Sequence, residues 1–166
     1  MRKAYCIIVF CFFINGAFAQ NVATINGKPI TNKEFMWFYK KNHIGNSAVS
    51  AQDLESYLNQ YINFKLKVLD AKEMGLDADT AYLAEIKNYE AALEAQKKGT
   101  AKSSKTYTMI MNEYCDAALM FNASEIKIWN KEKDDQERLE KEWIDTLRKK
   151  YIIKINQNEV KKLAKL

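Results

Sequence analysis

One segment constrains the fold more than any other: the run from Ser50 to Met74 reads as a long helix with apolar side chains on almost every side. Ser50 is a favourable N-cap, and Gly75 is a natural stop because a positive φ costs glycine little. A helix that is apolar around most of its circumference is usually central and covered by other elements. Its large apolar residues are Leu54, Tyr57, Leu58, Tyr61, Ile62, Phe64, Leu66, Val68 and Leu69.

The two ends of the chain carry the strand signals. Asn26-Gly27 lies in the middle of residues 22–30 and predicts a hairpin, because a type I′ turn needs positive φ at both central positions. Pro29 cannot donate a ladder hydrogen bond, so the second arm must be an edge strand. The β-branched run 151–155 is the other strand candidate. Since an isolated hairpin is marginally stable, we predict that residues 151–155 pair with it.

Helix signals fill the rest of the chain, so the fold is predicted to be mostly α, with about five helices and this small sheet. Thr31 and Glu34 fit a capping box at the start of the first helix. Residues 20–166 are expected to form one domain: the hairpin and first helices at 20–99, a small and polar linker at 100–105, and the C-terminal helices and strand at 106–166. The later helices are predicted from Asp77 or Asp79 to near Gly99, with an inward stripe of Leu83, Ile86, Tyr89, Ala92 and Leu93, from about Lys105 to Phe121, and from Ser124 to about Lys150 after a break and new cap at Asn122-Ala123-Ser124-Glu125.

The first nineteen residues have the pattern of a secretory signal peptide. Arg2 and Lys3 precede an apolar run that is too short to span a membrane, and Ala17-Phe18-Ala19 is a cleavage pattern. Cleavage would leave 147 residues with a net charge of +3 and Cys115 as the one cysteine. An internal disulfide is then impossible, and the charge is too small to favour nucleic-acid binding. We expect a periplasmic chain without stable membrane insertion.

Few residues offer catalytic or cofactor chemistry. His43 is the single histidine, at the expected end of the first helix, where an imidazole near the last carbonyls is a common capping arrangement. Neither a phosphate-binding glycine loop nor a metal-ligand spacing is present, so no cofactor or metal is expected. The carboxylates of the charged helix are expected to lie in water, without the burial that raises a catalytic pKa; they are Asp134, Asp135, Glu137, Glu140 and Glu142.

Three stretches of the chain resemble the SurA/PpiC-type periplasmic folding factors. The resemblance implies a chaperone domain with a C-terminal helix and strand, in a family of peptidyl-prolyl isomerases. The parvulin module that catalyses isomerisation in such factors is not found in the matching place, at residues 100–105, so we expect a chain that is not an enzyme. The matching segments are 22–31 with Glu34-Phe35, then 61–68 with Ala71-Lys72 and Gly75-Leu76-Asp77, and finally 143–151 with 153–156.

The function expected from these features is a periplasmic holdase that binds unfolded or outer-membrane polypeptides. Methionine and aromatic side chains suit varied clients because they adapt their shape and offer a large contact area. Two alternatives stay open: a secreted scaffold subunit with one fixed protein partner, and a residual member of the isomerase family. Each proposed residue can equally be ordinary core, with Phe35 and Phe38 the best core pair. The candidate client-binding residues are Met36, Trp37, Phe38 and Tyr39, with Met109, Met111 and Phe121 as a second patch.

Overall fold

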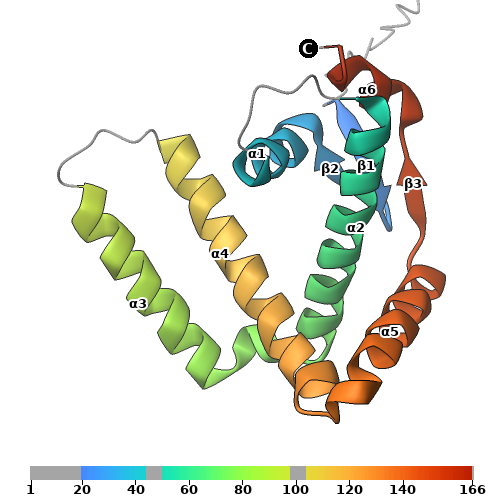
Figure 1. Cartoon of the computed structure of the whole chain (residues 1–166). Coiled ribbons are helices and arrows are strands. Elements are labelled where there is room, and N and C mark those ends of the chain that lie inside the picture. Colours follow the sequence, from blue (N-terminus) through green and yellow to red (C-terminus); the bar gives the residue numbers. More distant parts are fainter. Residues whose placement is uncertain (1–19, 44–49, 98–103, 166) are drawn as a thin grey trace, which may run out of the picture.

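The computed structural model describes residues 20–43, 50–97 and 104–165, which form six α-helices and a small sheet at one side of the molecule (Figure 1). The prediction of a mostly α fold with a small sheet is confirmed. In chain order the elements are β1 (Asn21–Ile25), β2 (Lys28–Thr31), α1 (Asn32–Asn42), α2 (Ala51–Glu73), η1 (Leu76–Ala78), α3 (Thr80–Lys97), α4 (Ser104–Ser124), η2 (Glu125–Trp129), η3 (Lys133–Asp135), α5 (Gln136–Lys150), β3 (Ile153–Ile155) and α6 (Gln157–Leu163).

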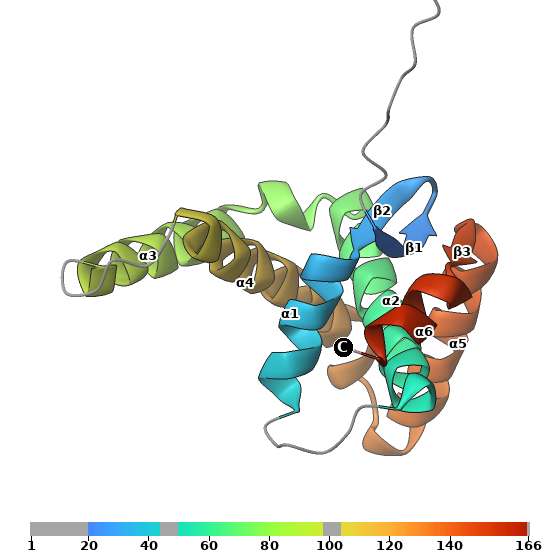
Figure 2. The same cartoon turned by 90° about the horizontal axis from the view of Figure 1, so that it is seen from above.

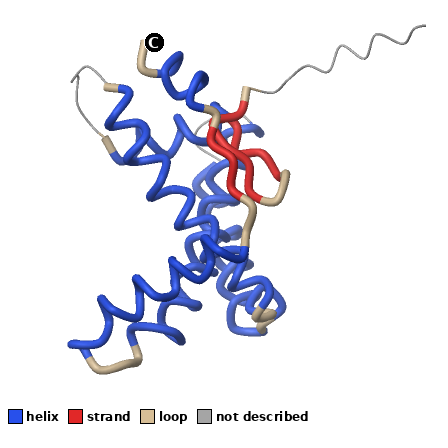
Figure 3. Tube along the Cα trace, turned by 90° about the vertical axis from the view of Figure 1, so that its right-hand side faces the viewer, coloured by secondary structure: helices blue, strands red, loops and turns tan. Residues whose placement is uncertain are grey.

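The sheet joins the two ends of the described chain, as Figure 3 shows. Its order is β2-β1-β3 with both pairings antiparallel, so the C-terminal strand pairs with the hairpin as predicted. Asn26 and Gly27 have φ values of 48° and 77°, which are the positive values of the expected turn. Pro29 lies on the edge strand β2, where its missing N–H costs no ladder bond.

Helix α2 is the centre of the molecule, as its all-round apolar character predicts. It packs against α1, α4, α5 and α6, and Ser50 caps it by accepting a 3.0 Å hydrogen bond from the Asp53 amide. Gly75 follows the helix with a φ of 77° and ends it. The fully buried side chains of α2 are Leu54, Leu58, Ile62, Leu66 and Ala71, and they form one core with Val22, Phe35, Leu119, Leu147 and Val160.

Helices α3 and α4 form an arm that extends away from the sheet side of the molecule, as Figures 1 and 2 both show. Tyr89 on α3 stacks on Tyr114 of α4 at 3.5 Å between ring centroids. The inward face of α3 includes Tyr82 and Leu93, whereas Leu83, which was predicted to face inward, is 51% exposed. The predicted linker at 100–105 lies partly outside the described residues, and its last two residues already belong to α4.

The predicted helix break at 122–125 is wrong. Helix α4 continues to Ser124 and runs directly into the π-helical turn η2, and the chain changes direction only after Trp129. Ala123 and Ser124 are completely buried, and the Ser124 hydroxyl lies 3.4 Å from the sulfur of Met120, one turn back on its own helix. The serine therefore packs along α4 and does not cap a new helix.

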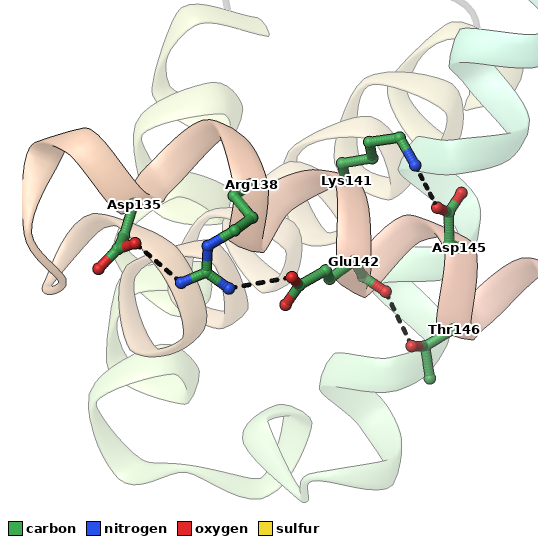
Figure 4. A network of polar contacts seen from close by, with 6 residues as sticks. All are labelled: Asp135, Arg138, Lys141, Glu142, Asp145 and Thr146. Carbon is green, nitrogen blue, oxygen red and sulfur yellow. Dashed lines mark hydrogen bonds and ion pairs between the residues drawn. The ribbon is translucent and has the colours of Figure 1, made fainter.

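The charged surface of α5 lies in water, as its sequence predicts (Figure 4). Arg138 pairs with Asp135 at 2.8 Å and with Glu142 at 2.9 Å, and Lys141 pairs with Asp145 at 2.7 Å. All five side chains are half exposed or more, so these pairs contribute little to stability. The opposite face of α5 buries Trp143 and Leu147 against the core.

Residues 1–19, predicted to be a signal peptide, lie outside the described residues. Within the described residues, none of the helices combines the length and the apolar character that crossing a membrane requires.

Candidate functional site

A cleft between α1 and α4 is the candidate site. It consists of an inner cavity of about 620 Å³ and a neighbouring, more open cavity of about 750 Å³. Trp37 of α1 and Met109 of α4 line both cavities, so the two form one continuous site. The open cavity is lined by Met36, Trp37, Met109, Ile110 and the stems of Lys33, Lys40 and Lys41.

The cleft exists because α1 carries five large side chains in succession. At about 100° per residue, one packing face cannot bury all of them. Phe35 and Tyr39 point inward and are 0% and 6% exposed, and both rings pack against Tyr57 of α2. Met36 and Trp37 stay half-buried and face the cleft.

The floor of the cleft is a network of charged and hydroxyl groups between α1, α2 and α4. Lys65 of α2 contacts Asp116 at 2.6 Å and Glu34 at 3.3 Å. Burial opposes the charge of Lys65, but the two carboxylates outweigh it and raise the pKa of this lysine. Burial, reinforced by the charge of Glu34, raises the pKa of Tyr61 far above its ordinary value, and the hydroxyl donates a 2.7 Å hydrogen bond to Glu34. The polar groups of the floor are therefore paired with one another, and Tyr61 keeps its proton at neutral pH.

Glu113 of α4 ties the wall of the cleft to α1. Its carboxylate accepts a hydrogen bond from the Trp37 indole at 3.2 Å and pairs with Lys41 at 2.6 Å. The Trp37 ring is thus held by one polar atom while its apolar faces line the cavities. This arrangement presents a large aromatic surface with a fixed orientation.

Two lysines face each other at the mouth of the cleft. Lys33 comes from α1 and Lys105 from α4, and both line the inner cavity. The hydrogen-bond contact with Lys105 lowers the pKa of Lys33 most, followed by desolvation and by the like charge of Lys105. The mouth therefore concentrates positive charge next to the apolar wall.

The structure brings together part of the predicted client-binding set. Met36, Trp37, Phe38 and Met109 all line the cleft. Tyr39 is in the core and is not available to a client, because packing against α2 takes the face of α1 on which it lies. Met111 is half-buried on α4 outside the lining of the two cavities.

Phe121 lies apart from the cleft, near the end of α4. It is 52% exposed and packs edge-on against Trp129 of η2, with ring centroids 4.9 Å apart. The second predicted patch is therefore divided: Met109 belongs to the cleft, and Phe121 forms a separate aromatic pair with Trp129.

Sequence reasoning missed most of the residues that line the cleft, among them Lys33, Lys105, Ile110 and Glu113. Ile110 follows Met109 directly and was within reach of the same argument. The other three are charged residues on solvated helices, and only the pairing of α1 with α4 distinguishes them from ordinary surface residues.

Two further residues have structural roles in this region. His43 ends α1, with its ring stacked on Tyr39 and Nδ1 3.0 Å from the Tyr39 carbonyl, as a capping imidazole. Cys115 lines the inner cavity and is partly exposed. Across the described residues, no three His, Cys, Asp or Glu side chains lie where they could hold a metal ion.

Comparison with known proteins gives a distant and partial relationship. Three proteins match, from Bordetella pertussis, Bordetella parapertussis and Bordetella bronchiseptica, and each is named a probable parvulin-type peptidyl-prolyl cis-trans isomerase. Each is 36% identical over 76 residues, which is 46% of this chain and 30% of the relative, so the chain spans under a third of their length. The chain matches no established family profile, and no solved structure matches it.

This relationship corrects one expectation and supports another. The expectation that the chain is not an enzyme is contradicted, because the relatives carry the name of an enzyme family. The resemblance to the wider parvulin-type isomerase group is supported by the same match. The specific likeness to SurA stays a prediction.

Proposed function

We propose that this chain binds unfolded polypeptide segments in the cleft between α1 and α4, as the chaperone part of a periplasmic folding factor related to the parvulin-type isomerases. One observation carries the proposal: Met36, Trp37, Met109 and Ile110 are gathered from two helices around an open cavity of about 750 Å³. Cavities of roughly 300–1,000 Å³ lined mainly by apolar side chains are typical binding sites. This one is large enough for apolar side chains of an extended peptide.

The composition of the wall favours varied clients over a single ligand. Methionine has an unbranched, polarisable side chain that adapts to partners of different shape. Trp37 supplies a rigid aromatic surface beside the methionines, oriented by its bond to Glu113. An adaptable wall next to a fixed ring suits short segments of unrelated sequence that share apolar side chains.

The proposed location and clients are supported by the sequence alone. The signal-peptide pattern at residues 1–19 and the three SurA-like segments support a periplasmic location and outer-membrane polypeptides as clients. The relatives named as isomerases support a place in the same group of folding factors.

Suppression of aggregation tests the proposal. A denatured outer-membrane protein is diluted into buffer with the chain at equimolar and tenfold ratios, and light scattering is recorded. The double variant M36Q/M109Q removes the apolar wall while keeping straight side chains of similar length and good helix propensity. Wild type should suppress scattering and the double variant should lose most of this effect.

The matched control is L83Q, which makes the same kind of change at an exposed position on α3. It should protect as well as wild type, and thermal melting should show that all three chains fold. Equal protection by M36Q/M109Q and wild type would contradict a role for the cleft, and no protection by wild type would contradict the holdase function.

Peptidyl-prolyl isomerisation is the second candidate, and the names of the relatives favour it. A proline-containing tetrapeptide assay measures it directly on the same preparations. Acceleration above background supports catalysis by this chain, and loss of that acceleration in M36Q/M109Q would place the reaction in the cleft. A background rate would contradict this candidate without affecting the aggregation result.

A further inference from the structure

Lysines outnumber carboxylates in the lining of the cleft, and some of the lysines have no carboxylate partner. Six lysines line the two cavities, against three carboxylates. All three carboxylates are already paired within the protein: Glu34 and Asp116 with Lys65, and Glu113 with Lys41. The negative charges of the site are therefore compensated before any ligand binds, whereas part of the positive charge is not.

The uncompensated charge lies beside the apolar wall. Lys33, Lys40 and Lys105 form no ion pair with a carboxylate of the described residues. Lys33 and Lys40 line the open cavity together with Met36 and Met109, and no carboxylate lines that cavity. A ligand side chain seated on the apolar wall therefore lies within a short distance of ammonium groups that lack a counter-ion.

Lys33 and Lys105 make the strongest case because they come from different helices. Lys33 is on α1 and Lys105 on α4, and both line the inner cavity, where contact with Lys105 lowers the pKa of Lys33. An anion between them would accept charge-assisted hydrogen bonds from both and remove the repulsion. The protein thus holds two like charges together at the inner cavity.

We propose that the cleft selects extended segments in which an aromatic or large apolar side chain is followed closely by an aspartate or glutamate. The apolar side chain enters the cavity against Trp37 and Met109, and the acidic side chain lies between Lys33 and Lys105. The inference rests on the proposed function for the cleft and adds a charge requirement to it. The occupant is a carboxylate of a side chain, because a segment inside an unfolded client seldom presents its terminus.

Matched peptides test the charge requirement on the full mature chain. Three capped peptides share one aromatic residue and differ at two following positions, which are Asp and Glu, Asn and Gln, or Lys and Lys. A fourth peptide has the neutral sequence with a free C-terminal carboxylate. Affinities are measured by isothermal titration calorimetry at about 50 and 500 mM salt, where the Debye length falls from about 14 to 4 Å and exposed charges are increasingly screened.

The acidic peptide should bind about tenfold more tightly than the neutral one at low salt, as two charge-assisted contacts allow. This advantage should shrink at high salt and disappear in K33Q/K105Q. That variant should lose much less affinity for the neutral peptide than for the acidic one, because Met36, Trp37, Met109 and Ile110 still line the open cavity. The control K133Q/K149Q makes the same charge change on exposed residues near α5 and should keep the full advantage.

The outcomes separate this inference from the proposed function. Equal affinity for the acidic and neutral peptides, or an advantage that survives in K33Q/K105Q, would overturn the charge requirement while binding of both peptides still supports the cleft as a client site. Preference for the free C-terminus over the acidic side chains would also overturn it. Absence of binding by every peptide would refute both proposals.

Discussion

Replacing Leu163 with alanine tests whether the C-terminal segment is part of the hydrophobic core that stabilises the fold. Leu163 is 7% exposed at the end of α6, and it belongs to the same core as Val22 of β1 and Leu54 of α2. Removing a buried leucine side chain costs its transfer free energy and leaves a cavity, together about 2–5 kcal/mol. We expect the free energy of unfolding to fall by about 3 kcal/mol.

That loss converts to a shift in melting temperature that is easily measured. For a chain of this size each kcal/mol lowers the melting temperature by roughly 2–4 °C, so L163A should melt about 6–12 °C below wild type. Thermal denaturation followed by far-ultraviolet circular dichroism gives the value. K161A changes an exposed residue of the same short helix and should stay within about 0.5 kcal/mol of wild type.

Truncation after Lys150 extends the same reasoning to the whole segment. It removes three buried apolar side chains, Tyr151, Val160 and Leu163, together with the strand that pairs with β1. At about 1.5–3 kcal/mol per side chain, the loss of about 5–9 kcal/mol approaches the total stability of an ordinary domain. The truncated chain should be largely unfolded at 25 °C. A wild-type melting temperature for L163A or for the truncation would refute this role of the C-terminal segment.

Three further predictions concern stability. Asp70 pairs with Lys127 at 2.7 Å in a mostly buried site, so D70N and K127M should each destabilise the chain, and a double-mutant cycle in urea should give a coupling of about 1–3 kcal/mol; purely additive effects would contradict the pairing. Gly75 has a φ of 77° and no atom near an added Cβ, so G75A should cost about 1 kcal/mol in the same assay through backbone strain alone, and no loss would contradict this. Lys162 holds the pKa of the Glu159 carboxyl below its usual 4.5, so the stabilisation from the ionised form is full above pH 4.5 and is lost as the pH falls through the lowered pKa. The melting-temperature advantage of wild type over E159Q should therefore shrink under acid, and an advantage independent of pH would count against the ion pair.

Local signals in the sequence are sufficient for the features that depend on a few neighbouring residues. Asn26-Gly27 predicts its turn because few other pairs adopt two positive φ values without strain. Thr31 and Ser50 predict their helix starts because each hydroxyl accepts from the amide three residues on, at 3.1 and 3.0 Å. Gly75 predicts its helix end because glycine adopts a positive φ with little strain. These signals place the hairpin turn and the starts of the two helices that follow it, whereas the C-terminal strand is shorter than the predicted run 151–155 and covers Ile153–Ile155.

The errors occur where a local pattern competes with burial elsewhere in the chain. Ser124 has the sequence of a helix cap, but Ser124 and Ala123 are buried and the helix continues through η2. Leu83 and Tyr82 are neighbours on α3, and either could face inward by periodicity. Contact with the remainder of the fold places Tyr82 inside. In both cases the deciding partner is distant in sequence, so no local pattern reveals it.

The candidate site was partly predictable for a related reason. The excess of large side chains on α1 follows from the sequence alone, and so does the conclusion that some must remain outside the core. Which helix faces them does not follow, because the contacts between Trp37 and Glu113 and between Lys65 and Asp116 join residues 76 and 51 positions apart. The charged residues that line the cleft come together only through these long-range pairings, so the sequence-based prediction does not contain them.

The polar floor explains why the cleft stays open instead of closing into more core. Lys65, Asp116 and Glu34 remain 24%, 15% and 30% exposed, so each keeps part of its hydration. If α4 moved onto α1 to bury Trp37 and Met109 fully, these three charges would lose that water, and desolvation of paired charges can exceed the attraction between them. The gain from burying two half-buried apolar side chains, about 1 kcal/mol each, is smaller than the several kcal/mol needed to desolvate the ions. The charges beneath the apolar wall thus keep it accessible, and a segment bound as proposed would cover the wall from the open side without displacing the floor.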